Sequence, residues 1–111
     1  MKIFAILIML QLTAVTLYAQ DKVKRFCEMS VSGRRIRLDY GQTKTSDPFR
    51  DPVYINKLLR VESFEKMVAA MNYMSDMGWK YEGSTPIHYS ENSNEIRVLF
   101  SKEFEPAALT K

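Results

Sequence analysis

Apolar and polar residues alternate with period two over two segments near the start of the chain, which predicts two strands. Gly33, which follows Ser32, supplies a turn between them, because glycine accepts a positive φ at low cost. The two strands are therefore expected to form a hairpin with one apolar and one charged face. The apolar face carries Val23, Cys27, Met29 and Val31 from residues 22–31, and Ile36, Leu38 and Tyr40 from residues 35–40; Arg35, Arg37 and Asp39 lie on the charged face.

Apolar residues then recur at three- and four-residue steps, which predicts one amphipathic helix over residues 63–77. Ser63 is a suitable N-cap, and Gly78 is a suitable left-handed residue after the last turn. A methionine-rich stripe at this spacing is typical of packed core. The stripe consists of Phe64, Met67, Val68, Met71, Met74 and Met77.

Two further strands are predicted over residues 79–89 and 95–104. Gly83 and Pro86 indicate an irregular, edge-like course for the first of them. Residues 41–52 contain two Asp-Pro pairs and are expected to form a loop. Residues 53–61 have two interpretations, either short strands or an irregular flap over the core.

The order strand–strand–helix–strand–strand predicts an α+β domain, with a four-stranded antiparallel sheet (ββαββ order) and one helix packed on one face. The other face of the sheet is then covered only by its own side chains or by a partner. The expected core joins Phe64, Val68, Met71 and Met74 of the helix to Ile36, Leu38, Trp79, Tyr81, Val98 and Phe100 of the strands.

The first 19 residues have the pattern of a secretory signal peptide: Lys2, an apolar run and the small residue Ala19 before a polar stretch. An uncleaved anchor is the alternative, although the apolar run is short for a span of about 20 residues. Cleavage after Ala19 removes 19 of the 111 residues and leaves 92. We expect a single domain over residues 20–104, a flexible tail over residues 105–111, and an exported protein, periplasmic or secreted, with no membrane span after cleavage.

Charge and cysteine content narrow the function classes. The exported chain would carry 15 basic and 13 acidic side chains, which is too mild a positive charge for a nucleic-acid-binding protein. The single cysteine, Cys27, cannot form an internal disulfide, so the fold depends on its core. We expect Cys27 to be buried; an intermolecular disulfide, or a thiol activated by His88, are the alternatives.

Several short motifs carry a resemblance to known proteins. The chain resembles small exported proteins of unknown function from Bacteroides-type bacteria over nearly all of residues 20–104, and its helix–Gly-Trp–strand unit is more loosely similar to short bacterial domains with a helix on a small antiparallel sheet. The resemblance implies an envelope or secreted location and brings no activity, cofactor or catalytic residue. The motifs are Phe26-Cys27-Glu28, Asp39-Tyr40-Gly41-Gln42, Met71-Asn72-Tyr73-Met74, Gly78-Trp79 and Lys102-Glu103-Phe104.

The sequence offers few groups for catalysis or metal binding. It contains no G-x-G-x-x-G, P-loop, H-E-x-x-H or G-x-S-x-G motif, and His88 is its only imidazole. One His and one Cys do not make a zinc site without carboxylates. We therefore expect no metal, no cofactor and no enzymatic activity; a calcium site at Asp39, Asp47 and Asp51 is an alternative.

The remaining candidate is a basic surface formed by Lys24, Arg34, Arg35 and Arg37 on the charged face of the first hairpin. Such a patch on an exported protein suits an anionic partner; a solvated face balanced by nearby acids is the alternative. The sequence thus predicts a small, non-enzymatic binding or protein-interaction module of the cell envelope. Its expected partners are an envelope protein or an anionic glycan, or a second copy in a homodimer. A small enzyme using His88, or a structural subunit of an envelope complex, are the other hypotheses.

Overall fold

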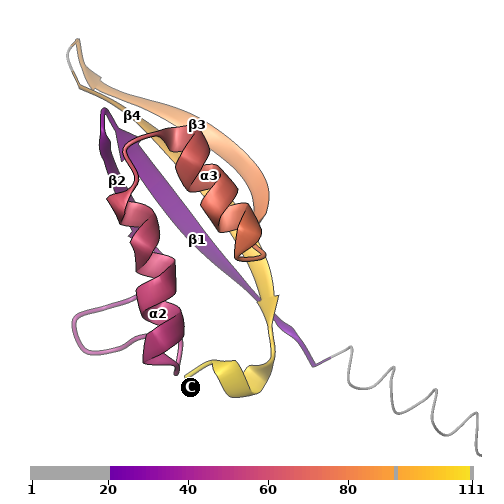
Figure 1. Ribbon diagram of the computed structural model, residues 1–111. Coiled ribbons are helices and arrows are strands. Elements are labelled where there is room, and N and C mark those ends of the chain that lie inside the picture. The colour runs from indigo at the N-terminus through magenta and orange to yellow at the C-terminus, as the bar shows by residue number, and fades with distance from the viewer. Residues whose placement is uncertain (1–20, 92, 111) are drawn as a thin grey trace, which may run out of the picture.

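The computed structural model describes residues 21–91 and 93–110, so the predicted signal peptide, residues 1–19, lies outside the described residues. Four strands form one antiparallel sheet in the order β2-β1-β4-β3 (Figure 1). This confirms the predicted four-stranded antiparallel sheet. The strands are β1 (Val23–Ser32), β2 (Arg35–Asp39), β3 (Lys80–Ser90) and β4 (Ser93–Phe104).

The two long strands β1 and β4 are central, and each forms a hairpin with a neighbouring edge strand. The turn between β1 and β2 includes Gly33, whose φ of 61° favours glycine. In the centre of the sheet Cys27 lies opposite Phe100, and Met29 lies opposite Val98. These four side chains are buried, so the period-two pattern of both strands correctly indicated their inward face.

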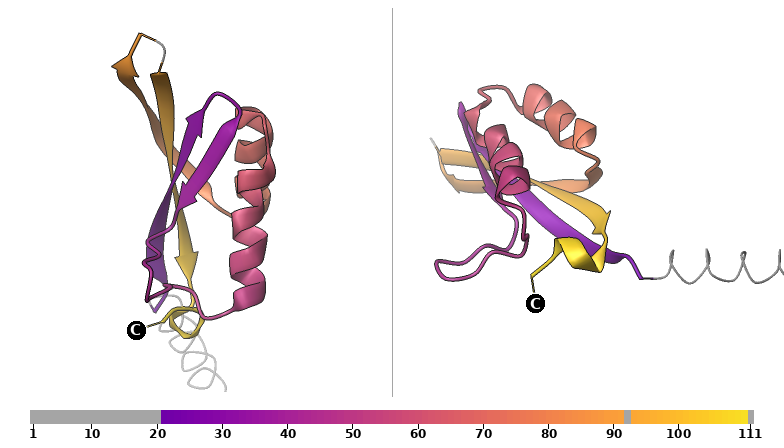
Figure 2. Two further views of the ribbon diagram at one scale, coloured as in Figure 1. Left: turned by 90° about the vertical axis from the view of Figure 1, so that its left-hand side faces the viewer. Right: turned by 60° about the horizontal axis from the view of Figure 1, so that its bottom comes forward.

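Two helices, rather than the one expected, lie between β2 and β3, and both cover the same face of the sheet (Figure 2). They are α2 (Pro52–Leu59) and α3 (Met67–Asp76), joined through the 3-10 turn η1 (Arg60–Ser63). The single-helix ββαββ order is therefore wrong. The Asp51 side chain accepts a hydrogen bond of 2.9 Å from the Val53 N–H, and Pro52 is the first residue of α2. This Asp-Pro pair starts a helix instead of punctuating a loop.

Helix α3 is shorter than the sequence pattern indicated, and one residue of its predicted apolar stripe, Val68, faces away from the sheet. The Ser63 hydroxyl donates to the Arg60 carbonyl at 2.7 Å within η1, so Ser63 does not cap α3. Ala70 and Met74, four residues apart, are buried against the sheet, whereas Val68 is 65% exposed. Val68 was expected in the core, and its outward position follows from the small Ala70 facing the sheet on the opposite side of the helix.

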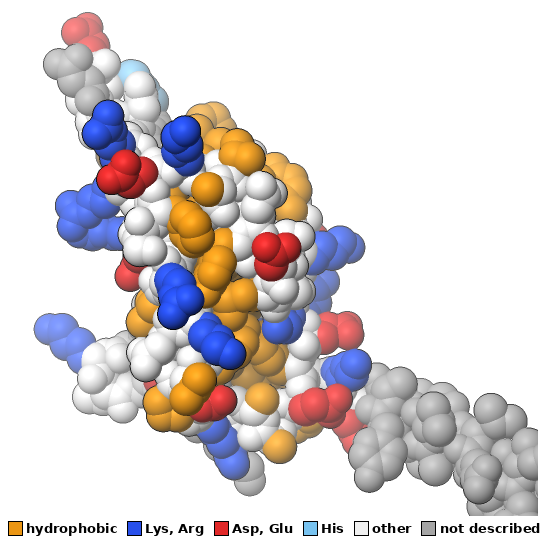
Figure 3. Space-filling model, viewed as in Figure 1, with side chains coloured by type: hydrophobic (Ala, Val, Ile, Leu, Met, Phe, Trp, Pro, Cys, Tyr) orange, Lys and Arg blue, Asp and Glu red, His pale blue; other side chains and the backbone are white. Residues whose placement is uncertain are grey.

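One hydrophobic core fills the space between the sheet and the helix layer. Tyr81, which was expected there, is 49% exposed, because β3 is an edge strand; its ring packs edge to face with the Phe100 ring. Apolar side chains also show on the surface between α2 and α3, where they run as a strip among charged groups (Figure 3). The partly buried apolar residues are Val23, Tyr54, Ile55, Leu59, Phe64, Met67, Met71, Tyr73 and Met77.

The predicted flexible tail, residues 105–111, is packed against the body of the protein as far as Thr110. Its 3-10 turn η2 (Pro106–Ala108) leads to Leu109, which is 5% exposed and pairs with Phe49 in an isolated bridge. The Thr110 N–H donates to the Pro48 carbonyl at 2.9 Å. Leu109 therefore adds an apolar side chain to the core, which the Pro106 stop signal did not indicate.

Candidate functional site on the outer face of the sheet

The face of the sheet turned away from α2 and α3, here called the outer face, carries the candidate site. The side chains that alternate with the buried core residues of β1 and β2 point to this face. In the register of the sheet, Arg37 lies opposite Ser30, and Arg35 lies opposite Ser32. Because the two serines are small, a shallow hollow of about 190 Å³ opens between the arginines and Glu95 on β4. The outer face thus has a shallow hollow next to the two neighbouring cations, Arg35 and Arg37.

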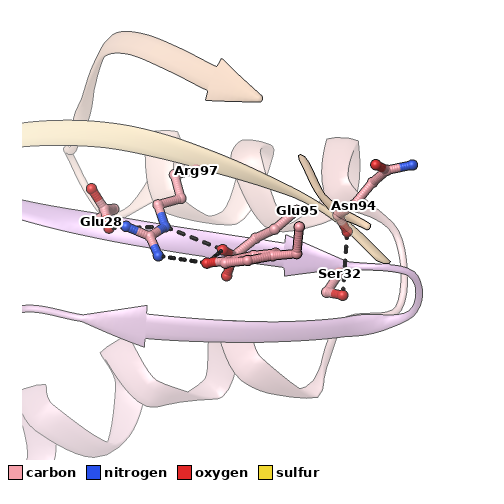
Figure 4. Close-up of polar contacts among 6 residues, drawn as sticks. Glu28, Ser32, Asn94, Glu95 and Arg97 are labelled. Carbon is pink, nitrogen blue, oxygen red and sulfur yellow. Dashed lines mark hydrogen bonds and ion pairs between the residues drawn. The ribbon is translucent and has the colours of Figure 1, made fainter. Parts of the chain in front are cut away.

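Arg97 forms the ridge on the far side of this hollow and is held by two carboxylates. Its Nε atom lies 3.2 Å from Glu95 Oε2 and 3.8 Å from Glu28 Oε1, and it lies between these residues (Figure 4). The Tyr89 hydroxyl donates to Glu95 at 2.9 Å and accepts from Arg97 at 3.0 Å. The Tyr89 hydrogen bond, followed by those of Arg97, lowers the pKa of Glu95. The charge of Arg97 is therefore already balanced within the protein.

Arg35 and Arg37 differ from Arg97 because no carboxylate of residues 21–91 and 93–110 lies within 4.0 Å of their guanidinium nitrogens. Both side chains are exposed. A guanidinium presents its N–H groups as a planar fork, which matches a carboxylate, sulfate or phosphate. The pair, with the hydroxyls of Ser30 and Ser32 beside it, is therefore able to receive an external anion without breaking an internal ion pair.

The structure brings together only part of the predicted basic surface. Arg34 lies in the exposed turn between β1 and β2, beside Arg35. Lys24 lies on the outer face near the other end of β1, six residues or about 20 Å from Ser30. The sequence reading missed Ser30, Ser32 and Glu95, although alternation along each strand indicates their face. Their proximity to the arginines depends on strand register, which the alternation does not give.

Lys24 belongs instead to a second polar cluster at the start of β3. It lines a hollow of about 330 Å³ together with Lys80 and Ser101. The Ser101 hydroxyl donates to Glu82 at 2.5 Å, and this bond, followed by the nearby charges of Lys24 and Lys80, lowers the pKa of Glu82. These lysines thus lie near a carboxylate, and an ammonium group lacks the planar fork of a guanidinium, which makes the cluster a weaker anion site than Arg35 and Arg37.

The hypothesised pair of Cys27 and His88 is not formed. Cys27 is 2% exposed within the core, and burial raises the pKa of its thiol to about 12. The ring of His88 contacts Asn94, and its position on β3 is six β4 residues away from the level of Cys27, or about 20 Å. An activated thiolate at Cys27 is therefore not supported, because an activating base must lie within hydrogen-bond reach.

The three aspartates considered for calcium have separate structural roles. Asp47 accepts hydrogen bonds from the Tyr40 hydroxyl and the Phe49 N–H, Asp51 caps α2, and Asp39 accepts from the Gly41 N–H. Within residues 21–91 and 93–110, no three His, Cys, Asp or Glu side chains gather closely enough to hold a metal ion. The carboxylates thus organise the loop after β2 instead of forming a common site.

Both outer edges of the sheet are obstructed. The Leu38 N–H of edge strand β2 donates to the Glu62 carboxylate at 2.9 Å. Edge strand β3 contains Pro86, which has no N–H, and its register shifts between Tyr81 and Gly83. Such features disfavour the addition of another strand. The outer face, and not an edge, is therefore the surface better suited to contact a partner.

None of the helices formed by residues 21–91 and 93–110 is long and apolar enough to cross a bilayer. Comparison of the chain with family models, with curated proteins and with solved structures gives no match.

Proposed function

We propose that this protein is a small, exported, non-enzymatic binding module that recognises an anionic partner with the outer face of its sheet. The observation that carries the proposal is the pair Arg35 and Arg37 beside the hollow over Ser30 and Ser32, because no carboxylate of the described residues lies within 4.0 Å of either guanidinium. The partner is an envelope protein or an anionic glycan. Export rests on the leader-like pattern of residues 1–19.

The neighbouring groups support recognition by the guanidinium pair. Arg97 is held by Glu28 and Glu95, so the ridge beside the hollow is fixed and offers no free positive charge. An incoming carboxylate or sulfate beside this hollow therefore meets positive charge at Arg35 and Arg37, and not at Arg97. Because both side chains are exposed, the attraction is screened by salt, and we expect affinity to fall as ionic strength rises.

The proposal is tested by titrating the purified protein, observed by amide NMR, with a short oligogalacturonate and separately with an oligoglutamate peptide. We expect at least one probe to shift the amide signals around Ser30 and Ser32. The double variant Arg35→Ala/Arg37→Ala is expected to bind that probe about tenfold more weakly or worse, since a hydrogen bond to a charged group contributes about 1.5–3 kcal/mol.

A matched variant, Lys44→Ala/Arg60→Ala, removes two exposed positive charges away from the outer face and is expected to bind like the unmodified protein. Binding of neither probe, or equal weakening in both double variants, would contradict recognition by Arg35 and Arg37. The mass of the complex, measured in the same samples, distinguishes a bound probe from a second copy of the chain.

A further inference from the structure

A second hollow lies on the outer face, on the other side of the Arg97 ridge. It has a volume of about 350 Å³, and its lining includes Thr85, Ile87 and Leu99. The hollow is open because Gly83 lies opposite Leu99 in the register of β3 and β4 and contributes no side chain to cover it. Leu99 is consequently 38% exposed on the surface of a central strand.

Neither backbone conformation nor crowding requires glycine at position 83. Its φ is not in the positive range, and a Cβ atom added there would meet no other atom within 4 Å. Gly78 provides the contrast, with a φ of 90° and the Lys102 stem 3.2 Å from an added Cβ. What Gly83 does contribute is open space over Leu99. A glycine within a strand often marks a bulge, and the register does shift between Tyr81 and Gly83; it also often marks the close approach of a ligand or of another chain.

We propose that this hollow receives an aliphatic side chain of a protein partner, which places a carboxylate against Arg35 and Arg37 at the same time. The contact between this carboxylate and the two arginines rests on the proposed function. Ile87 and Leu99 match an aliphatic group and offer no hydrogen-bond partner to the hydroxyls of a glycan placed over them. Polar side chains complete the lining, namely those of Glu28, Ser84, Thr85 and Arg97. Arg97, which lies between the two hollows, is paired with Glu28 and Glu95, and the three side chains together carry one net negative charge. The part of a partner chain that crosses Arg97 is therefore expected to carry no acidic side chain.

The spacing of the two hollows matches an extended peptide. Two to three strand separations of about 4.8 Å lie between β2 and the gap between β4 and β3, which makes roughly 12 Å. In an extended chain, residues four positions apart lie on the same side and about 13 Å from each other. The expected partner segment therefore carries an acidic residue and an aliphatic residue at positions i and i+4.

A displayed library of random eight-residue peptides, selected on the purified protein, tests this proposal. We expect the enriched sequences to combine an acidic residue with an aliphatic residue at this spacing. Selection on Gly83→Leu, which fills the hollow, is expected to lose the aliphatic preference but keep the acidic one. Selection on Arg35→Ala/Arg37→Ala is expected to lose the acidic preference but keep the aliphatic one. The two selections thus distinguish failure of this inference from failure of the proposed function.

The affinity of a synthetic peptide with the enriched sequence then measures how much the hollow contributes to binding. We expect Gly83→Leu to weaken its binding about tenfold or more, because the buried aliphatic side chain is excluded. Thr45→Leu, which adds the same side chain to an exposed loop, should bind normally. If Gly83→Leu does not fold, as judged by its thermal unfolding, Thr85→Leu occupies the same hollow from an exposed position.

Three outcomes would overturn the inference: no enrichment, enriched sequences without the aliphatic position, or unchanged peptide affinity in Gly83→Leu. Binding of oligogalacturonate through Arg35 and Arg37, together with no peptide enrichment, would assign the face to a glycan and leave the proposed function intact.

Discussion

The side chain of Glu62 and the backbone of Leu38 are joined by a hydrogen bond of 2.9 Å, in which the carboxylate accepts from the outward-facing N–H of the edge strand. The two residues are 24 positions apart, and their bond ties the turn η1 to β2. One acidic side chain thus holds the helix layer against the edge of the sheet and occupies a donor that another strand would otherwise seek.

Replacement of Glu62 by alanine is expected to destabilise the protein by about 1–3 kcal/mol, because the Leu38 N–H loses its acceptor. Glu62→Gln keeps an acceptor and should cost less. The free energy of unfolding, obtained from urea denaturation, measures both. Glu65→Ala, a nearby exposed acid, is the control and should change stability by no more than about 0.5 kcal/mol. Equal stability of Glu62→Ala and Glu65→Ala would show that the bond contributes nothing.

Leu109→Ala is expected to destabilise the protein by about 2–5 kcal/mol, because it leaves a cavity beside Phe49 in the core. Glu105→Ala, at an exposed position just before η2, should have little effect. Thermal and urea unfolding of both variants give the comparison. If Leu109→Ala unfolds like the unmodified protein, the C-terminal segment is not part of the folded body.

Helix α3 offers a matched pair that tests which of its sides faces the sheet. Met74 is fully buried, so Met74→Ala is expected to cost about 2–5 kcal/mol. Val68 is 65% exposed, and Val68→Ala should change stability by no more than about 0.5 kcal/mol. A loss for Val68→Ala as large as that for Met74→Ala would contradict the outward position of Val68 and agree with the core predicted from sequence.

Cys27 should make stability depend on pH in the alkaline range. Burial raises the pKa of the folded thiol from 9.0 to about 12, so above about pH 9 the unfolded chain releases a proton that the folded chain retains. The contribution of the protonated Cys27 thiol to the free energy of unfolding is therefore fully present below pH 9 and is lost as the pH rises towards 12. Urea unfolding at pH 8 and pH 10 should show a larger loss for the unmodified protein than for Cys27→Ala. Equal losses in the two proteins would contradict this assignment.

The sequence predicted β1, β2 and β4 well because each of them buries one face, and alternation is then obligatory. Met29 and Val98 were assigned to the core from such a pattern, and both are buried. Helix α2 was missed because the signal of Asp51-Pro52 is shared by loops and helix starts. Asp51 acts as an N-cap only because the Ile55 and Leu58 side chains of α2 pack in the core against the sheet, and this packing is a tertiary effect.

The candidate site was predictable only as a set of charges on one face. Alternation placed Arg35 and Arg37 together, because they lie two residues apart on one strand. It also placed Lys24 on that face, but it contains no information on position across the strands. The register of β1 with β4 decides that Glu28 lies beside Arg97 and neutralises it, and this register is fixed by the core on the other side.

The division of the sheet into a covered and an outer face has a consequence for how the protein can change. A first group of residues, which includes Ser30, Gly83 and Thr85, contributes no side chains to the core, whereas a second group, such as Met29 and Val31 on either side of Ser30, forms it. Substitutions in the first group are therefore expected to alter recognition with little change in the free energy of unfolding. The chain would then serve as a scaffold on which new specificities evolve, or are selected from a randomised library, without repacking its interior.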